Sequence, residues 1–331
     1  MSNASLAARV PLRRLYDGTT IPAIGIGTFG SDKYGAEEVS NALYGAIRTG
    51  YRLIDCAAVY MNEHQIGEVL HRVLTEGIVS REELFVNSKV WNDQHRAVEA
   101  SCRQSLADLQ LDYLDLYFVH WPFPNYHAPG CDGDSRNPDS KPFSTEEFTD
   151  TWRQCEALVD AGLVRHIAMS NMTIRKLEAV LPQCRIKPAA IEMELHPSFQ
   201  QQALFDYCME RDILPIGFCP IGSPSRPERD RTAEDVVDAE LPAVRQAAEA
   251  HGDHPAVTCL KWAVQRGQIP IPFSVKEPQY TANLRAAFDD PLTEKEMTAI
   301  AAEDRNCRLI KGQVFLWPGA TDWHELWDEE A

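Results

Sequence analysis

The chain has 331 residues, 44% of them hydrophobic, and its formal net charge at pH 7 is −17. This length and apolar content suffice for a sizeable buried core, and the strongly acidic balance argues against nucleic-acid or anionic-membrane partners. No apolar run approaches the roughly 18 residues of a membrane-spanning helix, and the N-terminus lacks the pattern of a secretion signal. Nine scattered cysteines predict free thiols and a cytoplasmic protein.

The first predicted element is a β-hairpin, because two short apolar runs flank Asp17 and Gly18 in VPLRRLYDGTTIP. Eight short apolar segments then alternate with helical ones. In chain order these segments are IPAIGIGTF, YRLIDCA, LFVNSKV, YLDLYFVHW, RHIAMSN, AAIEMEL, LPIGFCP and QIPIPFS. Helices are expected over 37–49, after Asn62, over 94–109 and over 145–161, the last with Ser144 as N-cap.

Apolar residues fill the predicted strands throughout, as expected for parallel strands that are buried on both faces. Eight strand–helix units in this length favour the α/β class and a closed (β/α)8 TIM barrel over an open doubly wound sheet. We therefore expect a single domain over residues 1–331, with the hairpin at its start and residues 1–9 disordered.

Three segments interrupt the alternation. They are 122–142, rich in Pro, Gly, Asp and Asn; 223–238, which is charged; and a tail over 306–331 that carries three tryptophans. Loops that follow barrel strands lie on the C-terminal, catalytic face, so we expect the three segments to wall a substrate pocket. The alternative is that two are solvated insertions and the tail packs on the barrel wall.

Four residues suited to catalysis stand at or just after the ends of successive strands. Asp55 ends the second strand and Tyr60 lies in the loop after it, while Lys89 and His120 end the third and fourth strands. Because parallel strands end at one rim of a barrel, these side chains are expected to meet there. Each alone has an ordinary structural explanation, such as a strand-end ion pair or a loop aromatic, but their coincidence favours a catalytic site.

These residues lie in the stretches GYRLIDCAAVYMNEHQIG, NSKVW, HWP, IAMSN, ELHP, GFCPIGSP and IPIPFSVKEPQYTANL, which occur in this order. Through these stretches the chain resembles the aldo-keto reductase family, and the resemblance extends from about residue 10 to 317. The resemblance implies a catalytic tetrad of Asp55, Tyr60, Lys89 and His120. Tyr60 would protonate the carbonyl oxygen, and Lys89, held by Asp55, would lower the tyrosine pKa. His120 would orient the carbonyl for hydride transfer from a nicotinamide.

The resemblance also implies a cofactor site. Ser170, Asn171 and Glu192 would hold the nicotinamide amide, and Phe218 would stack on the ring. Glu192 stands where the family usually has glutamine, and a carboxylate accepts hydrogen bonds but does not donate them. The remaining expected cofactor residues are Gly27, Thr28, Pro220, Ile221, Ser274, Lys276 and Asn283. GIGTFG does not open a helix, so a Rossmann site is not indicated.

The adenosine end departs further from the family pattern. Pro-Lys-Ser-Val becomes Pro-Phe-Ser-Val over 272–275, and Gln279 replaces an arginine, so two cations are missing where a 2′-phosphate would bind. Lys276 could substitute for them, whereas Glu277 could take the ribose hydroxyls of NAD. Both NADP and NAD therefore remain open as cofactors.

The expected substrate is a small carbonyl compound, an aldose or a similar aldehyde, in a pocket lined by Phe29, Trp91 and Trp121. Polar residues of the long loop after the fourth strand suit a sugar; they are His127, Asp132, Asn137 and Lys141. A monomer is expected, with a dimer as the alternative.

Two other functions stay open on the same barrel. One is a protein that senses the nicotinamide cofactor with little turnover, and the other is an aldolase with Lys89 as Schiff-base amine. No metal is expected, because the histidines lack ligand spacing.

Overall fold

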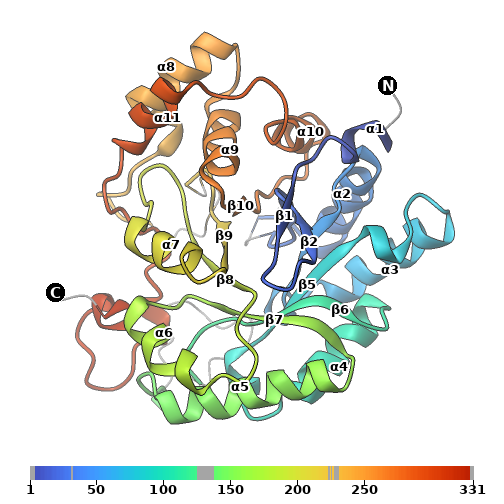
Figure 1. Ribbon diagram of the computed structural model, residues 1–331, viewed down its shortest axis with the longest axis vertical. Coiled ribbons are helices and arrows are strands. Elements are labelled where there is room, and N and C mark those ends of the chain that lie inside the picture. Colours follow the sequence, from blue (N-terminus) through green and yellow to red (C-terminus); the bar gives the residue numbers. More distant parts are fainter. Residues whose placement is uncertain are drawn as a thin grey trace.

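The structure is a computed structural model and describes residues 4–30, 33–124, 138–222, 224, 226 and 231–328. Eight parallel strands form its centre, in the order β10-β9-β8-β7-β6-β5-β4-β3 (Figure 1). They are β3 (Gly25–Gly27), β4 (Leu53–Asp55), β5 (Phe85–Val90), β6 (Leu114–Val119), β7 (Val164–Ser170), β8 (Ala190–Glu194), β9 (Leu214–Phe218) and β10 (Ile269–Pro270). Each coincides with a predicted segment, so the (β/α)8 TIM barrel of class α/β is confirmed.

The sheet closes into a barrel where its first and last strands meet. The amide of Gly27 donates to the carbonyl of Pro272 at 3.0 Å, and a Cβ atom on Gly27 would lie only 3.3 Å from the carbonyl oxygen of Ile271. Glycine therefore permits the close backbone approach that completes the ring. Side chains that face the barrel axis form a separate apolar cluster, which includes Leu53, Phe85, Leu116, Phe118, Ala168, Ala190, Leu214, Ile216, Ile269 and Ile271.

Helices surround the ring of strands (Figure 1). They are α2 (Ala36–Thr49), α3 (Glu63–Thr75), α4 (Val98–Leu109), α5 (Thr145–Asp160), α6 (Ile174–Val180), α7 (Gln202–Met209), α8 (Pro242–His251), α9 (Pro255–Arg266), α10 (Glu277–Arg285) and α11 (Glu294–Ala301). Apolar residues at helical spacing, such as Leu43 and Ile47, face the strands. The hydroxyl of Ser144 accepts from the amide of Glu147 at 3.3 Å, which confirms the predicted N-cap.

The predicted hairpin is present and closes the N-terminal end of the barrel. Strand β1 (Leu12–Arg14) pairs antiparallel with β2 (Thr20–Pro22), and the hairpin lies across the middle of the strands in Figure 1. Leu15 and Ile21 belong to the apolar cluster inside the barrel. They close the barrel interior at this end, so we expect ligands to bind at the opposite, C-terminal end.

The N-terminal residues correct one expectation. Residues 4–9, expected to be disordered, include helix α1 (Ala4–Ala7). The side chain of Leu6 packs against the main core, and Arg9 forms a 2.5 Å ion pair with Asp289 and lies over the ring of Phe288. These contacts offset the loss of chain entropy. Residues 1–3 lie outside the described part.

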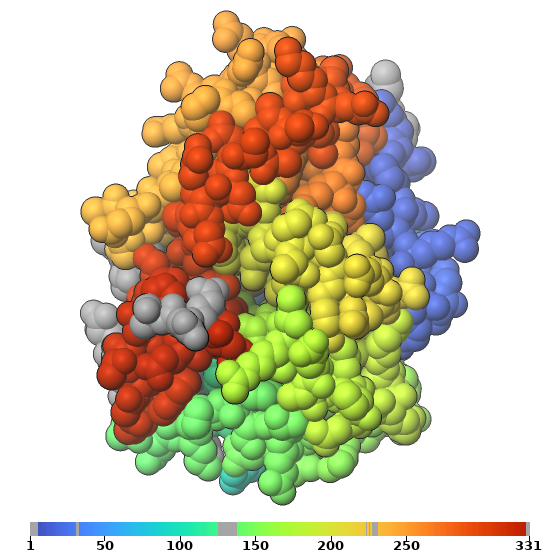
Figure 2. Space-filling view, turned by 60° about the vertical axis from the view of Figure 1, so that its left-hand side comes forward, coloured from blue at the N-terminus to red at the C-terminus, as the bar shows by residue number. Residues whose placement is uncertain are grey.

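The tail returns to the C-terminal end of the barrel. Its two short 3₁₀ helices, η7 (Gln313–Phe315) and η8 (Trp323–Trp327), join the aromatic cluster around Trp91 and Trp121. Lys176 anchors its end with a 2.7 Å ion pair to Asp328. In Figures 1 and 2 this segment, in red, lies beside α6.

The cysteines and the helices of the described residues bear on two further expectations, free thiols and the absence of a membrane-spanning helix. The eight cysteines of the described residues are all free thiols. No helix among the described residues has the length and apolar character needed to cross a membrane.

Candidate active site

Lys89 lies at the centre of the C-terminal rim and is 0% exposed. Its Nζ atom is 2.6 Å from Oδ2 of Asp55 and 3.1 Å from the carbonyl oxygen of Cys56. A second carboxylate approaches from β8, with Oε2 of Glu192 at 3.4 Å. Since Asp55 and Lys89 stand at the ends of adjacent strands, the barrel itself builds this ion pair.

Tyr60 and His120 complete the group. Tyr60 ends the 3₁₀ helix η1 (Ala58–Tyr60), and its ring centroid lies 5.4 Å from Lys89 Nζ. The ring of His120 meets that of Tyr60 edge-on at 5.8 Å between centroids. The structure thus brings together the four residues that the sequence placed at successive strand ends.

Burial and charge set the protonation states of this group. Burial favours the neutral amine of Lys89, but the charges of Asp55 and Glu192 overcome it and raise the lysine pKa above its ordinary value. Burial, with help from Lys89, lowers the pKa of His120 well below its ordinary value, so its ring is neutral. An amine held as a cation is a poor nucleophile, which argues against a Schiff-base aldolase.

The pKa of Tyr60 differs from the simple expectation. Burial raises it, and Lys89 lowers it as expected, but Asp55 and Glu192 add to the increase. The net effect is a raised pKa, so Tyr60 stays protonated at neutral pH. A proton is therefore available on Tyr60 for transfer.

Thr28, one of the expected cofactor residues, fixes the main chain at the end of β4. The Thr28 hydroxyl donates to the carbonyl oxygen of Asp55 at 2.8 Å, and Asn62 donates to the carbonyl oxygen of Thr28 at 2.8 Å. These bonds fix the end of β4 and hence the Asp55 carboxylate. Gly27 is used in barrel closure.

Ser170, Asn171 and Glu192 lie side by side across β7 and β8. Ser170 pairs with Glu192 in register, and the Asn171 amide donates to the Glu192 carbonyl oxygen at 3.0 Å. Asn171 has a left-handed backbone, with φ of 58°, and its side-chain amide donates to the carbonyl oxygen of His120 at 2.9 Å. The loop after β7 is therefore fixed to the end of β6.

Several buried polar atoms at this rim lack a hydrogen-bond partner among the described residues. They include Oδ1 of Asp55, Nδ1 of His120, Oδ1 of Asn171 and Oε2 of Glu192. Buried polar atoms are rarely left unpaired in a folded protein. A ligand that presents a carboxamide or a carbonyl oxygen would satisfy them, so this donor and acceptor set fits a nicotinamide and a carbonyl substrate.

The other expected cofactor residues lie on β9, the loop after it and the start of α10. Phe218 packs against the cluster inside the barrel, Pro220 is buried and Ile221 is half-buried. The Ser274 hydroxyl accepts from the amide of Lys276 at 3.1 Å and donates to Gln279 at 2.8 Å. The remaining two differ in exposure, since Lys276 is exposed and Asn283 is buried.

Aromatic side chains surround the rim above His120. Phe29 is 46% exposed and lies 5.1 Å from the Tyr60 ring. Trp91 meets His120 edge-on at 5.1 Å. Trp121 packs on Phe315 of the tail at 4.4 Å, so the two expected tryptophans connect the tetrad to the tail.

Two features were not anticipated from the sequence. Glu63, in the first turn of α3, is buried and accepts from the hydroxyls of Ser88 and Ser105. His196 is buried between Glu194 and Asp238. The histidine of ELHP was the available signal for the second feature, but its partner Asp238 lies 42 residues away in a segment without regular periodicity.

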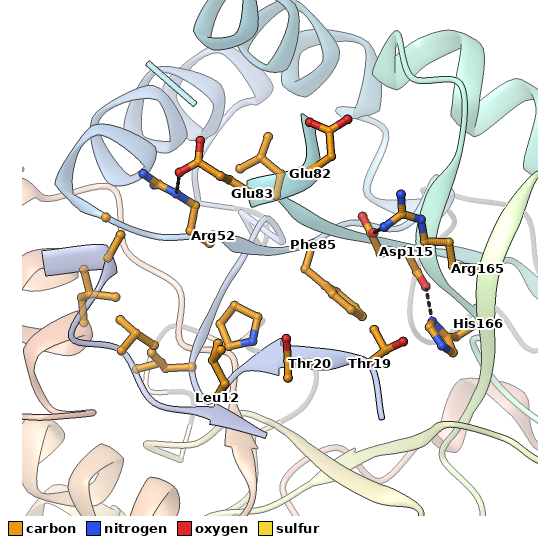
Figure 3. A pocket seen from close by; sticks show the side chains of 17 residues that line it. Leu12, Thr19, Thr20, Arg52, Glu82, Glu83, Phe85, Asp115, Arg165 and His166 are labelled. Atoms are coloured by element: carbon orange, nitrogen blue, oxygen red, sulfur yellow. Dashed lines mark hydrogen bonds and ion pairs between the residues drawn. The ribbon is translucent and has the colours of Figure 1, made fainter. Parts of the chain in front are cut away.

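A separate cavity of about 190 Å³ lies at the opposite, N-terminal end of the barrel (Figure 3). The hairpin residues Thr19 and Thr20 face Phe85 across it, and charged side chains line its edge (Figure 3). These charges pair with one another, as in the 4.0 Å contact of Arg52 with Glu83 and the 3.5 Å contact of Arg165 with Asp115. The cavity is far smaller than a dinucleotide site.

Of the four polar residues that suit a sugar in the loop after β6, one lies in the described part of the chain. His127, Asp132 and Asn137 lie outside the described residues, and Lys141 lies 3.5 Å from Glu147 of α5. The segment that leads to Asp238 contacts the tail, because Asp235 forms a 3.5 Å ion pair with Lys311.

Comparisons with known proteins agree with this geometry. The model of the aldo/keto reductase family matches residues 23–305. The chain is 40% identical over 321 residues to an aldo/keto reductase of Synechocystis sp., with 95% of each chain covered. It is 39% identical over 309 residues to aldo-keto reductase family 1 member A1 of Xenopus tropicalis, with 92% of each covered. A solved Bombyx mori aldo-keto reductase in complex with NADP superposes with a TM-score of 0.80 at 31% identity, covering 91% of this chain and 95% of that one.

Proposed function

The chain belongs to the aldo/keto reductase family and is an oxidoreductase, and on this premise we propose that it reduces a small aldehyde or ketone to the alcohol, with Tyr60 as general acid. The observation that carries the proposal is the convergence of Tyr60, Lys89, Asp55 and His120 at one rim of the barrel. The substrate class that we favour is an aldose or a similar small aldehyde.

Each residue of the rim has a separate role in delivering the proton and orienting the carbonyl group. When bound, the nicotinamide cofactor supplies a hydride to the carbonyl carbon. Tyr60 gives its proton to the carbonyl oxygen, and the cation of Lys89 stabilises the phenolate that remains. Asp55 holds Lys89 in position with the 2.6 Å ion pair. Neutral His120 directs the carbonyl oxygen toward Tyr60, and the aromatic wall of Phe29, Trp91 and Trp121 excludes water.

The cofactor would be NADPH or NADH, and the complex of the Bombyx mori reductase with NADP supports this class. Ser170, Asn171 and Glu192 would hold the carboxamide, and Phe218 would lie against the ring. Gly27, Thr28, Pro220 and Ile221 would shape the pocket beside it. Ser274, Lys276 and Asn283 would meet the adenosine end. We further propose a single domain over residues 1–331, a monomer and a cytoplasmic location.

The test is the loss of reduced-nicotinamide absorbance with purified protein and DL-glyceraldehyde or xylose, run with NADPH and NADH side by side. Tyr60→Phe should reduce kcat by at least about a hundredfold and leave cofactor affinity within about threefold of the original. Tyr44→Phe is the matched control, because Tyr44 lies on α2 and donates to Glu76 at 2.7 Å, away from the rim.

Each other outcome changes the assignment. Undiminished turnover in Tyr60→Phe would remove Tyr60 from the mechanism. Tight cofactor binding without turnover of any carbonyl would favour the cofactor-sensing alternative. Absence of binding by either reduced cofactor would contradict the proposed function.

A further inference from the structure

Among the described residues, two buried carboxylates lie within 4 Å of the buried ammonium of Lys89 at the C-terminal rim. Lys89 is the cation, and Asp55 at 2.6 Å already balances its charge. Glu192 is the second carboxylate, 3.4 Å from Lys89 and 2% exposed. Its Oε2 atom lacks a hydrogen-bond partner among the described residues. A buried, uncompensated carboxylate is costly, so this site favours any ligand that adds a positive charge.

The reaction itself fixes where that charge would be. In the proposed function, Tyr60 protonates the oxygen of the same carbonyl group whose carbon accepts the hydride. The nicotinamide ring must therefore reach the rim formed by Tyr60, Lys89 and His120, within a few ångströms of the reacting carbonyl. Glu192 borders this rim through Lys89, so the ring and its carboxylate are close enough for a strong charge interaction in the protein interior.

The two redox forms of the cofactor differ by this one charge. The oxidised nicotinamide ring is a cation, and the reduced ring is neutral. We infer that Glu192 is a specificity-determining residue that makes the protein bind the oxidised cofactor in preference to the reduced one. The inference rests on the proposed function and deepens it, because it concerns the state of the cofactor that the same site selects.

Other charged groups around Glu192 do not remove the effect. On β4 and β5, Asp55 and Lys89 form their own pair, and Tyr60 and His120 are neutral. Glu194, two residues further on β8, is engaged by His196 at 3.0 Å. The neighbour of Glu192 in register on β9 is the uncharged Ile216.

The negative charge of Glu192 can be neutralised by a proton as well as by a cationic ligand. Burial, followed by the charge of Asp55, raises the pKa of Glu192 to about 8. Below this pH the protonated side chain resembles glutamine, since it can donate as well as accept. Above it the carboxylate is ionised and attracts the oxidised ring. By linkage, the oxidised cofactor should expel a proton from Glu192 on binding, and the preference for it should increase with pH.

The experiment titrates tryptophan fluorescence with NADP⁺ and NADPH, and with NAD⁺ and NADH, at several pH values between roughly 6 and 9.5. In the original protein the ratio of the reduced to the oxidised dissociation constant should increase about tenfold across this range. Ionisation of the phosphates cancels in the ratio, because both redox forms carry the same phosphates. Glu192→Gln, which is nearly isosteric, should hold the ratio at its low-pH value throughout.

Glu63→Gln is the matched control, because it also replaces a buried glutamate. Glu63 accepts hydrogen bonds from Ser88 of β5 and Ser105 of α4. In this variant the ratio of dissociation constants should keep the original pH dependence. A second measurement needs no variant: calorimetry in buffers of different ionisation enthalpy should report, near pH 7, the release of more protons when NADP⁺ binds than when NADPH binds. A pH-independent ratio in the original protein, or an unchanged dependence in Glu192→Gln, would overturn the inference alone. Failure of both redox forms to bind would overturn the proposed function itself.

Discussion

Nδ1 of His196 lies 2.9 Å from Oδ2 of Asp238, and both side chains are fully buried. On its other side the same ring lies 3.0 Å from Glu194, which in turn accepts from the amides of Leu309 and Ile310. One imidazolium therefore joins three parts of the chain: the end of β8, the segment before α8 and the start of the tail.

Protonation of His196 should make stability depend on pH. Burial opposes the charged ring, but Asp238 and Glu194 raise the pKa of His196 to about 9, above the value near 6.5 of an unfolded chain. A raised pKa stabilises the folded state fully below the unfolded value, and this stabilisation is lost as the pH rises through about 9. The free energy of unfolding in urea should therefore fall by about 3 kcal/mol between pH 6 and pH 9.5.

His196→Gln provides the comparison for this prediction. The variant should be less stable at pH 6, where the imidazolium is lost and two carboxylates stay buried. The difference between the two proteins should shrink toward pH 9.5. A difference that stays constant over the range would show that His196 is neutral in the folded protein.

Phe315→Ala should weaken substrate binding. Phe315 of the tail contacts both Trp121, at 4.4 Å, and Trp91, at 5.9 Å, and Trp91 in turn contacts His120. Removal of the phenyl ring should loosen this wall and raise KM about tenfold, with kcat changed by less than about threefold. Steady-state kinetics with the preferred aldehyde measure both constants.

Phe205→Ala is the control for the loss of a buried phenyl ring, because Phe205 is similarly buried on α7, outside the barrel. Both variants should lose stability by about 3 kcal/mol, and only Phe315→Ala should change KM. Equal KM values in the two variants would show that the tail does not form the substrate wall.

The barrel and the meeting of Asp55, Tyr60, Lys89 and His120 at one rim could be predicted from the sequence, because local signals specify them. Each parallel strand is an apolar run, and a residue at the end of such a run must lie at the C-terminal rim. Asp55, Lys89 and His120 follow this rule directly. Tyr60 required the additional assumption that a short loop returns to the same rim.

The remaining features depend on contacts between distant segments, which periodicity does not encode. Asp238 reaches His196, and Arg9 reaches Asp289, across long stretches of chain. Even the pKa of Tyr60 could not be predicted from its neighbour Lys89 alone, because burial and the charge of Glu192 act in the opposite direction.

Lys89→Met should destabilise the protein as well as abolish turnover. Methionine keeps the approximate length of the side chain and removes the only cation within 4 Å of both Asp55 and Glu192 among the described residues. At neutral pH, where Glu192 is protonated, Asp55 would be left as a buried carboxylate without its cation. This should lower the free energy of unfolding by about 3–5 kcal/mol, measured in urea.

Lys89→Met combined with Asp55→Asn tests the physical origin of this loss. Asparagine removes the stranded charge of Asp55, so the double variant should be more stable than Lys89→Met alone, although it carries one more substitution. Additive losses would mean that the packing of Lys89, and not its charge, stabilises the rim.

Gln279→Arg should shift cofactor preference toward NADPH. Gln279 is exposed in the first turns of α10, accepts from Ser274 at 2.8 Å and stands near the exposed Lys276. An arginine there would offer a guanidinium to the 2′-phosphate, and bidentate pairs of this kind are strong. We expect the dissociation constant of NADPH to fall about fivefold or more and that of NADH to change by less than about twofold, both from fluorescence quenching. Gln279→Met is the uncharged control and should not favour NADPH. If the arginine tightened both cofactors equally, a general charge effect would replace recognition of the 2′-phosphate as the explanation, and the adenosine ribose would have to lie elsewhere than at the start of α10.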